Sequence, residues 1–217
     1  IVRALHFLHA SANLAHGNLS PESIVVTPAG DVKLWNFSIV TELTNKQLSR
    51  HFIEWEGLAT PDAYRSPERL EARWDALGLA GIHAMDSYGV SVLMQHFFRH
   101  SLPGPLVKAV QRMQTTNLKM RPRLQPLLKC PIFDTPYQKV QLQLEEFMVQ
   151  PVEQKIGFWQ NLTPNMQAGI YPESLSVHKL LPLITSTVDT ICQSDSLRSQ
   201  DLYRREGTNT NEIYVVL

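Results

Sequence analysis

Two polar stretches near the start of the chain, residues 16–23 and 36–38, hold the side chains whose types and spacing could do chemistry. Their candidate residues are His16, Gly17, Asn18, Ser20, Ser23, Asn36, Phe37 and Ser38. The amide of Asn18 has almost no basicity and cannot accept a proton as a carboxylate does. Asn36 offers a neutral oxygen where a hard cation such as Mg²⁺ prefers a carboxylate. Apart from the imidazole of His16, the polar side chains at these positions are therefore amides and hydroxyls, and none is a carboxylate that could act as the general base or as the usual ligand of a hard cation.

The elements that must position these stretches follow from local patterns. Apolar residues at helical spacing, with Asn13 as an ending residue, predict an amphipathic helix over residues 1–13. Residues 24–27 and 32–35 are short apolar runs, and the turn composition of residues 28–31 between them predicts a β-hairpin. The hairpin would lie between the two polar stretches.

The order of these features resembles the catalytic loop and metal-binding turn of protein kinases, His-Arg-Asp-Leu-x-x-x-x-Asn, a hairpin, then Asp-Phe-Gly. The positions that agree are structural: His16, Leu19, Pro21, Ile24 and Phe37. The positions that differ are chemical. Gly17 replaces Arg, Asn18 the catalytic Asp, Ser20 the usual Lys, Ser23 the metal-binding Asn, Asn36 the metal-binding Asp, and Ser38 the Gly.

These substitutions argue against phosphoryl transfer, which relies on metal ions and a carboxylate that accepts the hydroxyl proton. A positioned base alone raises the rate of a reaction by about 10²–10⁴-fold. Residues 16–18 taken by themselves also fit an ordinary loop, because such compositions are common in turns. The order of the motifs further along the chain favours the kinase-like interpretation.

Three later segments resemble further kinase motifs. Residues 64–70 resemble Tyr-x-Ala-Pro-Glu-x-Leu, which closes the activation segment, and residues 39–63 before them are polar and predicted to be irregular. Asp86 opens an apolar helix predicted over residues 86–99, buried all round. Residues 117–122 resemble Asn-Pro-x-x-Arg-Pro, and the resemblance implies a buried ion pair between Glu68 and Arg121. Kinases usually place another helix and an insert near residues 100–104, which this chain lacks.

Within the kinase-like proteins, the chain resembles the Scy-like pseudokinases, whose degenerate kinase domain is followed by HEAT-type helical repeats. The family has similar runs to Leu144-Glu145-Glu146, to residues 153–158 and to residues 178–182. Helices are also expected from residue patterns at Thr135-Pro136 and Gln150-Pro151. Apolar stripes are predicted for three helices: Val140, Leu144 and Phe147; Ile156, Trp159 and Leu162; Leu180, Leu181, Ile184 and Val188. A plain helical extension of the lobe is the alternative.

The expected fold is therefore mainly α. It comprises a kinase-like C-terminal lobe with helices and a small β-hairpin over residues 1–130, without the small lobe, and helical HEAT-like hairpins over 131–192. Residues 193–217 are an unassigned polar tail. Because the sequence starts at Ile1 inside an expected helix, we expect a fragment of a longer protein.

Composition narrows the other function classes. The 217 residues are 43% hydrophobic with a net charge of +0, so no global charge indicates nucleic acid or a membrane surface. Cys130 and Cys192 form neither a disulfide framework nor a metal-ligand spacing, which favours reduced thiols in the cytosol. Neither a transmembrane segment nor a signal peptide is predicted.

Other candidate sites carry weaker signals. His96 and His100 are spaced as two ligands on one helix face, but no third ligand is placed, so we expect a packed His96 and no metal. Residues 101–139 hold seven basic residues and the single acid Asp134, which fits either a docking surface for an acidic partner or anionic lipid, or simply a solvated face. The four tryptophans, Trp35, Trp55, Trp74 and Trp159, are expected in the core.

The leading hypothesis is a catalytically inactive scaffold without cofactor or metal. The resemblance implies a cytoplasmic adaptor at the Golgi or endosomes, whose partners are proteins such as vesicle coat or adaptor subunits. The alternative is weak ATP binding or residual protein kinase activity in the full-length protein, and a helical repeat protein with no partners of its own is a third interpretation.

Overall fold

The computed structural model describes residues 1–44, 48–99 and 101–193, so the predicted polar tail lies outside the described residues except for residue 193. The described chain is mainly helical with a few short strands, as the sequence predicts. It divides into two units: unit 1 comprises Ile1–Thr27 and Asp31–Phe133, and unit 2 comprises Pro28–Gly30 and the chain from Asp134 on. Within the described ranges, no helix combines the length and apolar character needed to cross a bilayer.

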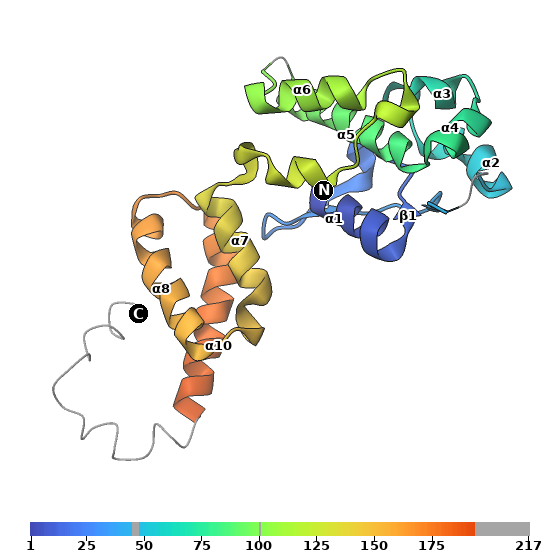
Figure 1. Cartoon of the computed structure of the whole chain (residues 1–217). Coiled ribbons are helices and arrows are strands. Elements are labelled where there is room, and N and C mark those ends of the chain that lie inside the picture. The colour runs from blue at the N-terminus through green and yellow to red at the C-terminus, as the bar shows by residue number, and fades with distance from the viewer. Residues whose placement is uncertain (45–47, 100, 194–217) are drawn as a thin grey trace, which may run out of the picture. The chain divides into compact units, whose positions relative to one another are not determined.

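Unit 1 contains the two polar stretches and most of the short elements (Figure 1). Its elements, where η marks a short 3₁₀- or π-helix, are α1 (Val2–Phe7), η1 (Leu8–Ala12), β1 (Leu14–Ala15), η2 (Pro21–Ser23), β2 (Ile24–Val26), β3 (Val32–Leu34), β4 (Thr41–Glu42), α2 (Arg50–Ala59), η3 (Asp62–Tyr64), α3 (Pro67–Leu70), α4 (Trp74–Ala80), α5 (His83–Phe98), α6 (Gly104–Met113), η4 (Leu118–Met120), η5 (Gln125–Lys129) and η6 (Pro131–Phe133).

Two antiparallel strand pairs hold the polar stretches in place. Strands β2 and β3 form the predicted hairpin, with Ile24 opposite Leu34 and Val26 opposite Val32. Strand β1 pairs with β4, so the chain is fixed immediately before His16. The first helix is confirmed as well, although it continues as the π-helix η1 and ends at Asn13, whose φ of 57° is left-handed. Asparagine tolerates this conformation better than most residues.

Helix α5 is the centre of the core of unit 1. Val90 and Leu93 pack with Leu5 of α1, Leu19 of the first polar stretch and Leu106 of α6 in one cluster. Met85, at the start of the helix, belongs to a second cluster with Ala15, Ile39, Phe52 and Leu77. The predicted burial on all sides holds for the first part of the helix only, because Gln95, His96 and Phe97 near its end are exposed. The buried part thus lies beneath the first polar stretch.

The prediction that residues 39–63 are irregular is wrong, because they contain the ten-residue helix α2. The side chain of Ser49 accepts a hydrogen bond from the backbone N–H of Phe52, which caps the first turn. Phe52 is fully buried, and Glu56, one turn later, is 3% exposed. The polar composition of residues 39–63 does not predict this helix, because its buried face holds one aromatic residue and one carboxylate rather than an apolar stripe.

Unit 2 is built from α7 (Pro136–Glu146), η7 (Phe147–Val149), α8 (Val152–Gln167), α9 (Glu173–Leu175), η8 (Ser176–Leu180) and α10 (Leu181–Gln193). As predicted from Thr135-Pro136, the Thr135 side chain caps α7 by accepting from the N–H of Gln138. The core contains Val140, Phe147, Phe158, Leu162, Leu175 and Leu180. That these helices begin a HEAT-type array, and that the domain boundaries match the predicted ones, stay predictions.

Two of the predicted apolar stripes in unit 2 need correction. Ile156 is 52% exposed, and Phe158, at 3%, fills the core instead. Leu181 is 56% exposed although the adjacent Leu180 is buried. Residues 176–180 form a π-helical turn, which has more residues per turn than an α-helix and so rotates the following side chains off the expected stripe. The side chain of Val188 lies outside the described residues.

Candidate functional site: the degenerate loop and its supports

The structure brings the two polar stretches together. The imidazole of His16 donates from Nε2 to the backbone oxygen of Trp35, at 3.0 Å. Its ring also meets that of Phe37 edge-on, with centroids 5.0 Å apart. The Nδ1 atom accepts the N–H of Asn18, so the neutral tautomer with a proton on Nε2 satisfies both contacts. Burial lowers the pKa of His16, although the nearby Asp86 carboxylate opposes the shift, and the ring therefore serves as a neutral link between the stretches.

The side chain of Asp86 in α5 binds the backbone of the first polar stretch. Its carboxylate accepts the backbone N–H of His16 at 2.8 Å and that of Gly17 at 2.9 Å. His9 Nε2 lies 2.8 Å from the same carboxylate, which is 1% exposed. Burial raises the pKa of Asp86, but the hydrogen bonds from His9 and the loop backbone outweigh it and leave the pKa lowered. The ionised carboxylate thus fixes the backbone of the loop.

We expect His83, which lies beside this cluster, to make the protein less stable in mild acid. Burial lowers the pKa of His83 from 6.5 to about 4, and the positive charge of Arg123 and the neighbouring His9 ring act in the same direction. The Asp86 carboxylate opposes this shift. Below about pH 6.5 the His83 side chain is protonated in the unfolded chain but stays neutral in the folded protein. The free energy of unfolding therefore decreases as the pH is lowered toward about 4. His83 is only half-buried, and solvent screening limits the loss to about 1–2 kcal/mol.

Urea unfolding at about pH 7 and about pH 5 measures this effect. The variant His83→Gln, which cannot titrate, should lose less stability over this interval than the parent. An equal loss in both proteins would contradict the assignment to His83.

The side chain of Ser23 is hydrogen-bonded to the backbone of Ser20 within the turn that begins η2. The hydroxyl of Ser23 donates to the backbone oxygen of Ser20 at 2.8 Å and accepts its N–H at 3.1 Å. Both residues are buried. The hydroxyl at the position that matches a metal-binding Asn therefore stabilises the turn.

Asn18 is tied to the segment that follows α2. Its Oδ1 accepts a hydrogen bond from the hydroxyl of Thr60 at 3.1 Å, and the Asn18 residue is 1% exposed. Arg69 donates to the same hydroxyl at 3.2 Å. The Asn18 Nδ2 atom has no hydrogen-bond partner among the described residues. At the position that matches the catalytic Asp, the side chain thus supports the loop by its carbonyl oxygen.

A buried ionic network extends this link to α2. Glu56 receives two hydrogen bonds from Arg69 through Oε2, the shorter at 2.8 Å, and one from Arg65 through Oε1 at 3.0 Å. Sequence reasoning missed Glu56, Thr60 and Arg69 as a unit. The signal that could have found it is the helix start at Ser49, since Phe52 and Glu56 are spaced i, i+4 and share one face of a helix.

The implied ion pair between Glu68 and Arg121 is present. Both side chains are 1% exposed, and two parallel hydrogen bonds of 2.6 and 2.9 Å join the guanidinium to the carboxylate. Burial raises the pKa of Glu68, but the hydrogen bonds and charge of Arg121 outweigh it, so the pKa is lowered. The pair joins α3 to the segment after η4, 53 residues away in the chain.

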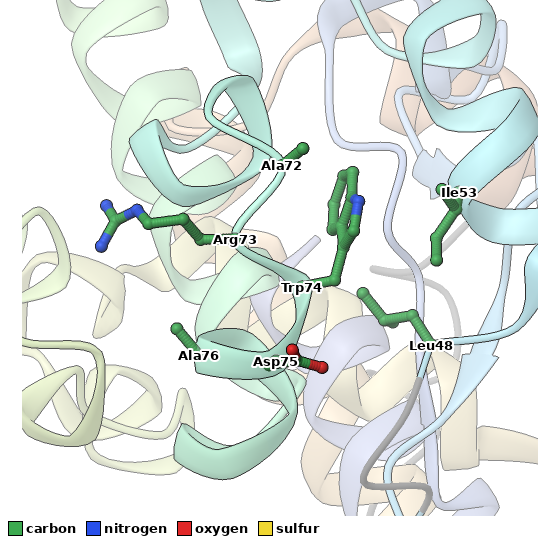
Figure 2. Close-up of a pocket in the computed structure, with 7 residues that line it drawn as sticks. All are labelled: Leu48, Ile53, Ala72, Arg73, Trp74, Asp75 and Ala76. Carbon is green, nitrogen blue, oxygen red and sulfur yellow. The ribbon is translucent and has the colours of Figure 1, made fainter.

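A pocket of about 520 Å³ opens on unit 1 between the start of α2 and α4 (Figure 2). Trp74 faces Leu48 and Ile53 across it, and Asp75 lies below them. None of its lining residues belongs to either polar stretch, so this cavity is separate from the kinase-like motifs. The roles of the eight motif residues stay a prediction.

Two other sequence expectations are corrected. His96 is exposed rather than packed, and its Nδ1 lies 2.9 Å from the hydroxyl of Tyr64; His100 lies outside the described residues. Trp74 and Trp159 pack against the cores, but Trp35 and Trp55 are 55% and 51% exposed. Within the described parts of the chain, no three His, Cys, Asp or Glu side chains are grouped to hold a metal ion.

The curated proteins that are similar to the chain include the following two. One is the "Probable inactive serine/threonine-protein kinase scy1" of Dictyostelium discoideum, 22% identical over 197 residues, which are 85% of this chain and 24% of that protein. The other is human "SCY1-like protein 2", 26% identical over 106 residues, 48% of this chain and 11% of that protein. The chain thus spans a quarter or less of the length of these relatives. No family model and no solved structure matches it.

Both names agree with the resemblance that the sequence motifs indicate, and the name of the Dictyostelium relative describes a probable inactive kinase. The similarity to that protein extends over most of the chain and so includes residues beyond the kinase-like motifs. The chain is therefore a relative of Scy1 and the SCY1-like proteins, one of which is named as a probable inactive protein kinase.

Proposed function

We propose that the protein to which this chain belongs is a catalytically inactive pseudokinase scaffold. The observation that carries the proposal is the commitment of the site's side chains to structure. Asn18 accepts a hydrogen bond from the Thr60 hydroxyl, and the Ser23 hydroxyl donates to the backbone oxygen of Ser20. The imidazole of His16 is hydrogen-bonded to the backbone oxygen of Trp35. Phosphoryl transfer needs a carboxylate base and charged metal ligands at these positions. The family name of the Dictyostelium relative supports the same conclusion.

The scaffold acts as an adaptor in Golgi or endosomal vesicle trafficking, in the cytoplasm. This part of the proposal is supported by the resemblance to the Scy-like family alone. Unit 2 would begin a HEAT-type array, whose helix pairs stack on their neighbours because one pair cannot bury its own apolar face. The exposed apolar side chains of Met148, Val149 and Ile156 are consistent with such stacking. The partners would be vesicle coat or adaptor subunits.

A phosphotransfer assay tests the inactive site. We expect the full-length protein with radiolabelled ATP and Mg²⁺ to transfer no more phosphate than its Asn18→Ala variant, because the amide contributes no basicity. An active kinase run in parallel confirms the assay conditions. Transfer that is abolished by Asn18→Ala would contradict the scaffold proposal and support the alternative, residual kinase activity.

An affinity purification tests the adaptor role separately. Full-length protein captured from cell lysate should enrich coat or adaptor subunits, whereas a version without the helical region after residue 133 should lose them. Enrichment of the same subunits by both versions would place the docking site in unit 1 instead.

A further inference from the structure

Positive charge is concentrated in one part of unit 1. Residues 87–133 contain no Asp or Glu, although the whole chain has a net charge of +0. The basic residues of this stretch are Arg99, Lys108, Arg112, Lys119, Arg121, Arg123 and Lys129. Because the chain is neutral overall, this segregation of charge along the sequence does not appear in its pI.

The structure separates these side chains into one internal cation and six external ones. Arg121 is buried against Glu68. The six others are exposed, and none of them forms an ion pair with another residue that the structure describes. The contrast with α2 to α4 is clear, since Arg50, Arg65, Arg69 and Arg73 are all paired with acidic side chains. The six cations, called the basic surface below, are therefore not neutralised by the fold.

Helix α6 presents part of this surface in a defined geometry. Leu106, Val110 and Met113 point into the core, so the helix is held against unit 1 by its apolar face. Lys108 and Arg112 are one turn apart on its exposed side. Figure 1 shows α6 at the edge of unit 1, next to α5.

Two large apolar side chains are exposed within the same stretch. Phe97, near the end of α5, is 58% exposed, and Met120 of η4 is 62% exposed. Cations combined with single apolar side chains fit the headgroup layer of an anionic bilayer, where the cations meet lipid phosphates and the apolar groups enter the acyl boundary. Protein interfaces are enriched in Arg, Met and aromatic residues but depleted of Lys, so the three exposed lysines of the stretch, Lys108, Lys119 and Lys129, are the residues that favour a bilayer.

We propose that the basic surface of unit 1 binds the surface of an anionic membrane. The attraction is electrostatic, acts within about one Debye length and is screened by salt. The bilayer is not crossed; Lys and Arg keep their charged ends at the headgroups while their apolar stems lie along the interface. This proposal concerns unit 1 and does not depend on the inactive site.

Flotation with lipid vesicles tests it. The 217-residue chain should float with phosphatidylcholine vesicles that contain about one third phosphatidylserine, and about tenfold less with pure phosphatidylcholine. Raising the salt from about 0.1 M to about 0.5 M should release the bound protein. The charge-reversed variant Lys108→Glu/Arg112→Glu should lose about tenfold in binding.

The matched control is Lys33→Glu/Arg50→Glu, which changes the net charge equally at two exposed cations outside the basic surface. It should keep most of the binding. Circular dichroism melting checks that both variants fold, and Lys108→Gln/Arg112→Gln provides a milder replacement if the reversal does not. Equal binding to neutral vesicles, an equal loss in the control, or binding of polyglutamate without binding of vesicles would overturn the proposal; the last result would indicate an acidic protein partner.

Discussion

Replacing Arg121 by alanine should lower the free energy of unfolding by about 3–5 kcal/mol, because it leaves the Glu68 carboxylate buried without its partner. The loss is larger than for a surface pair because the two side chains are 1% exposed and joined by two hydrogen bonds. Arg121 also donates from Nε to the backbone oxygen of Thr115 at 3.0 Å, so the segment after α6 loses a support as well. Urea unfolding followed by circular dichroism measures the change.

The matched control is Arg123→Ala, two residues further along. Arg123 is exposed and has no ion pair with a described residue, so its removal should change stability by no more than about 0.5 kcal/mol. An Arg121→Ala variant as stable as the parent would refute the structural role of the pair.

A double replacement separates the value of the pair from the cost of breaking it. In Glu68→Leu/Arg121→Met both charges are removed, so no unpaired charge is left in the core. Such replacements are often neutral for stability or even favourable. We therefore expect the double variant to be clearly more stable than Arg121→Ala. A double variant as unstable as the single one would mean that the contacts to Thr115 and Ala84, rather than the unpaired carboxylate, dominate.

The parts of the structure that the sequence predicted are those with strong local signals. The hairpin follows from two apolar runs around a turn, and the cap of α7 from Thr135 before a first-turn proline. The Glu68–Arg121 contact spans 53 residues, which no local pattern encodes. It could be foreseen only because both residues lie in motifs that resemble those of kinases.

The parts that were missed depend on tertiary contacts. Helix α2 is stabilised on its buried side by Phe52, packed in the second core cluster, and by Glu56 bound to Arg65 and Arg69. None of these partners is visible from the composition of residues 39–63. Trp35 shows the reverse case, since its indole N–H donates to the backbone oxygen of Glu22 at 2.7 Å while the side chain stays half exposed. A large apolar residue was expected inside, but one polar contact holds it at the surface.

Gly17→Ala should be the most damaging small substitution in the first polar stretch, lowering the free energy of unfolding by about 2–5 kcal/mol. Gly17 has a φ of +75°, a left-handed conformation that costs other residues about 1–2 kcal/mol. An added Cβ would also lie 2.8 Å from the ring of Phe52 and 3.1 Å from the backbone oxygen of Ile39. Overpacking of this kind typically costs about 1–3 kcal/mol. Restoring an arginine at this position would meet the same collision at its first side-chain atom.

The control is Gly57→Ala in α2, where an added Cβ would make only an ordinary contact of 3.6 Å with Arg65. Because alanine favours a helix interior over glycine by about 0.5–1 kcal/mol, this variant should be more stable than the parent. The two Gly→Ala changes are thus expected to have opposite effects on the stability of unit 1. Phe52→Leu combined with Gly17→Ala should show favourable coupling, since a smaller side chain relieves the collision but not the backbone strain. If Phe52→Leu and Gly17→Ala showed no coupling, the ring of Phe52 in α2 would not be packed on the loop at Gly17 as described.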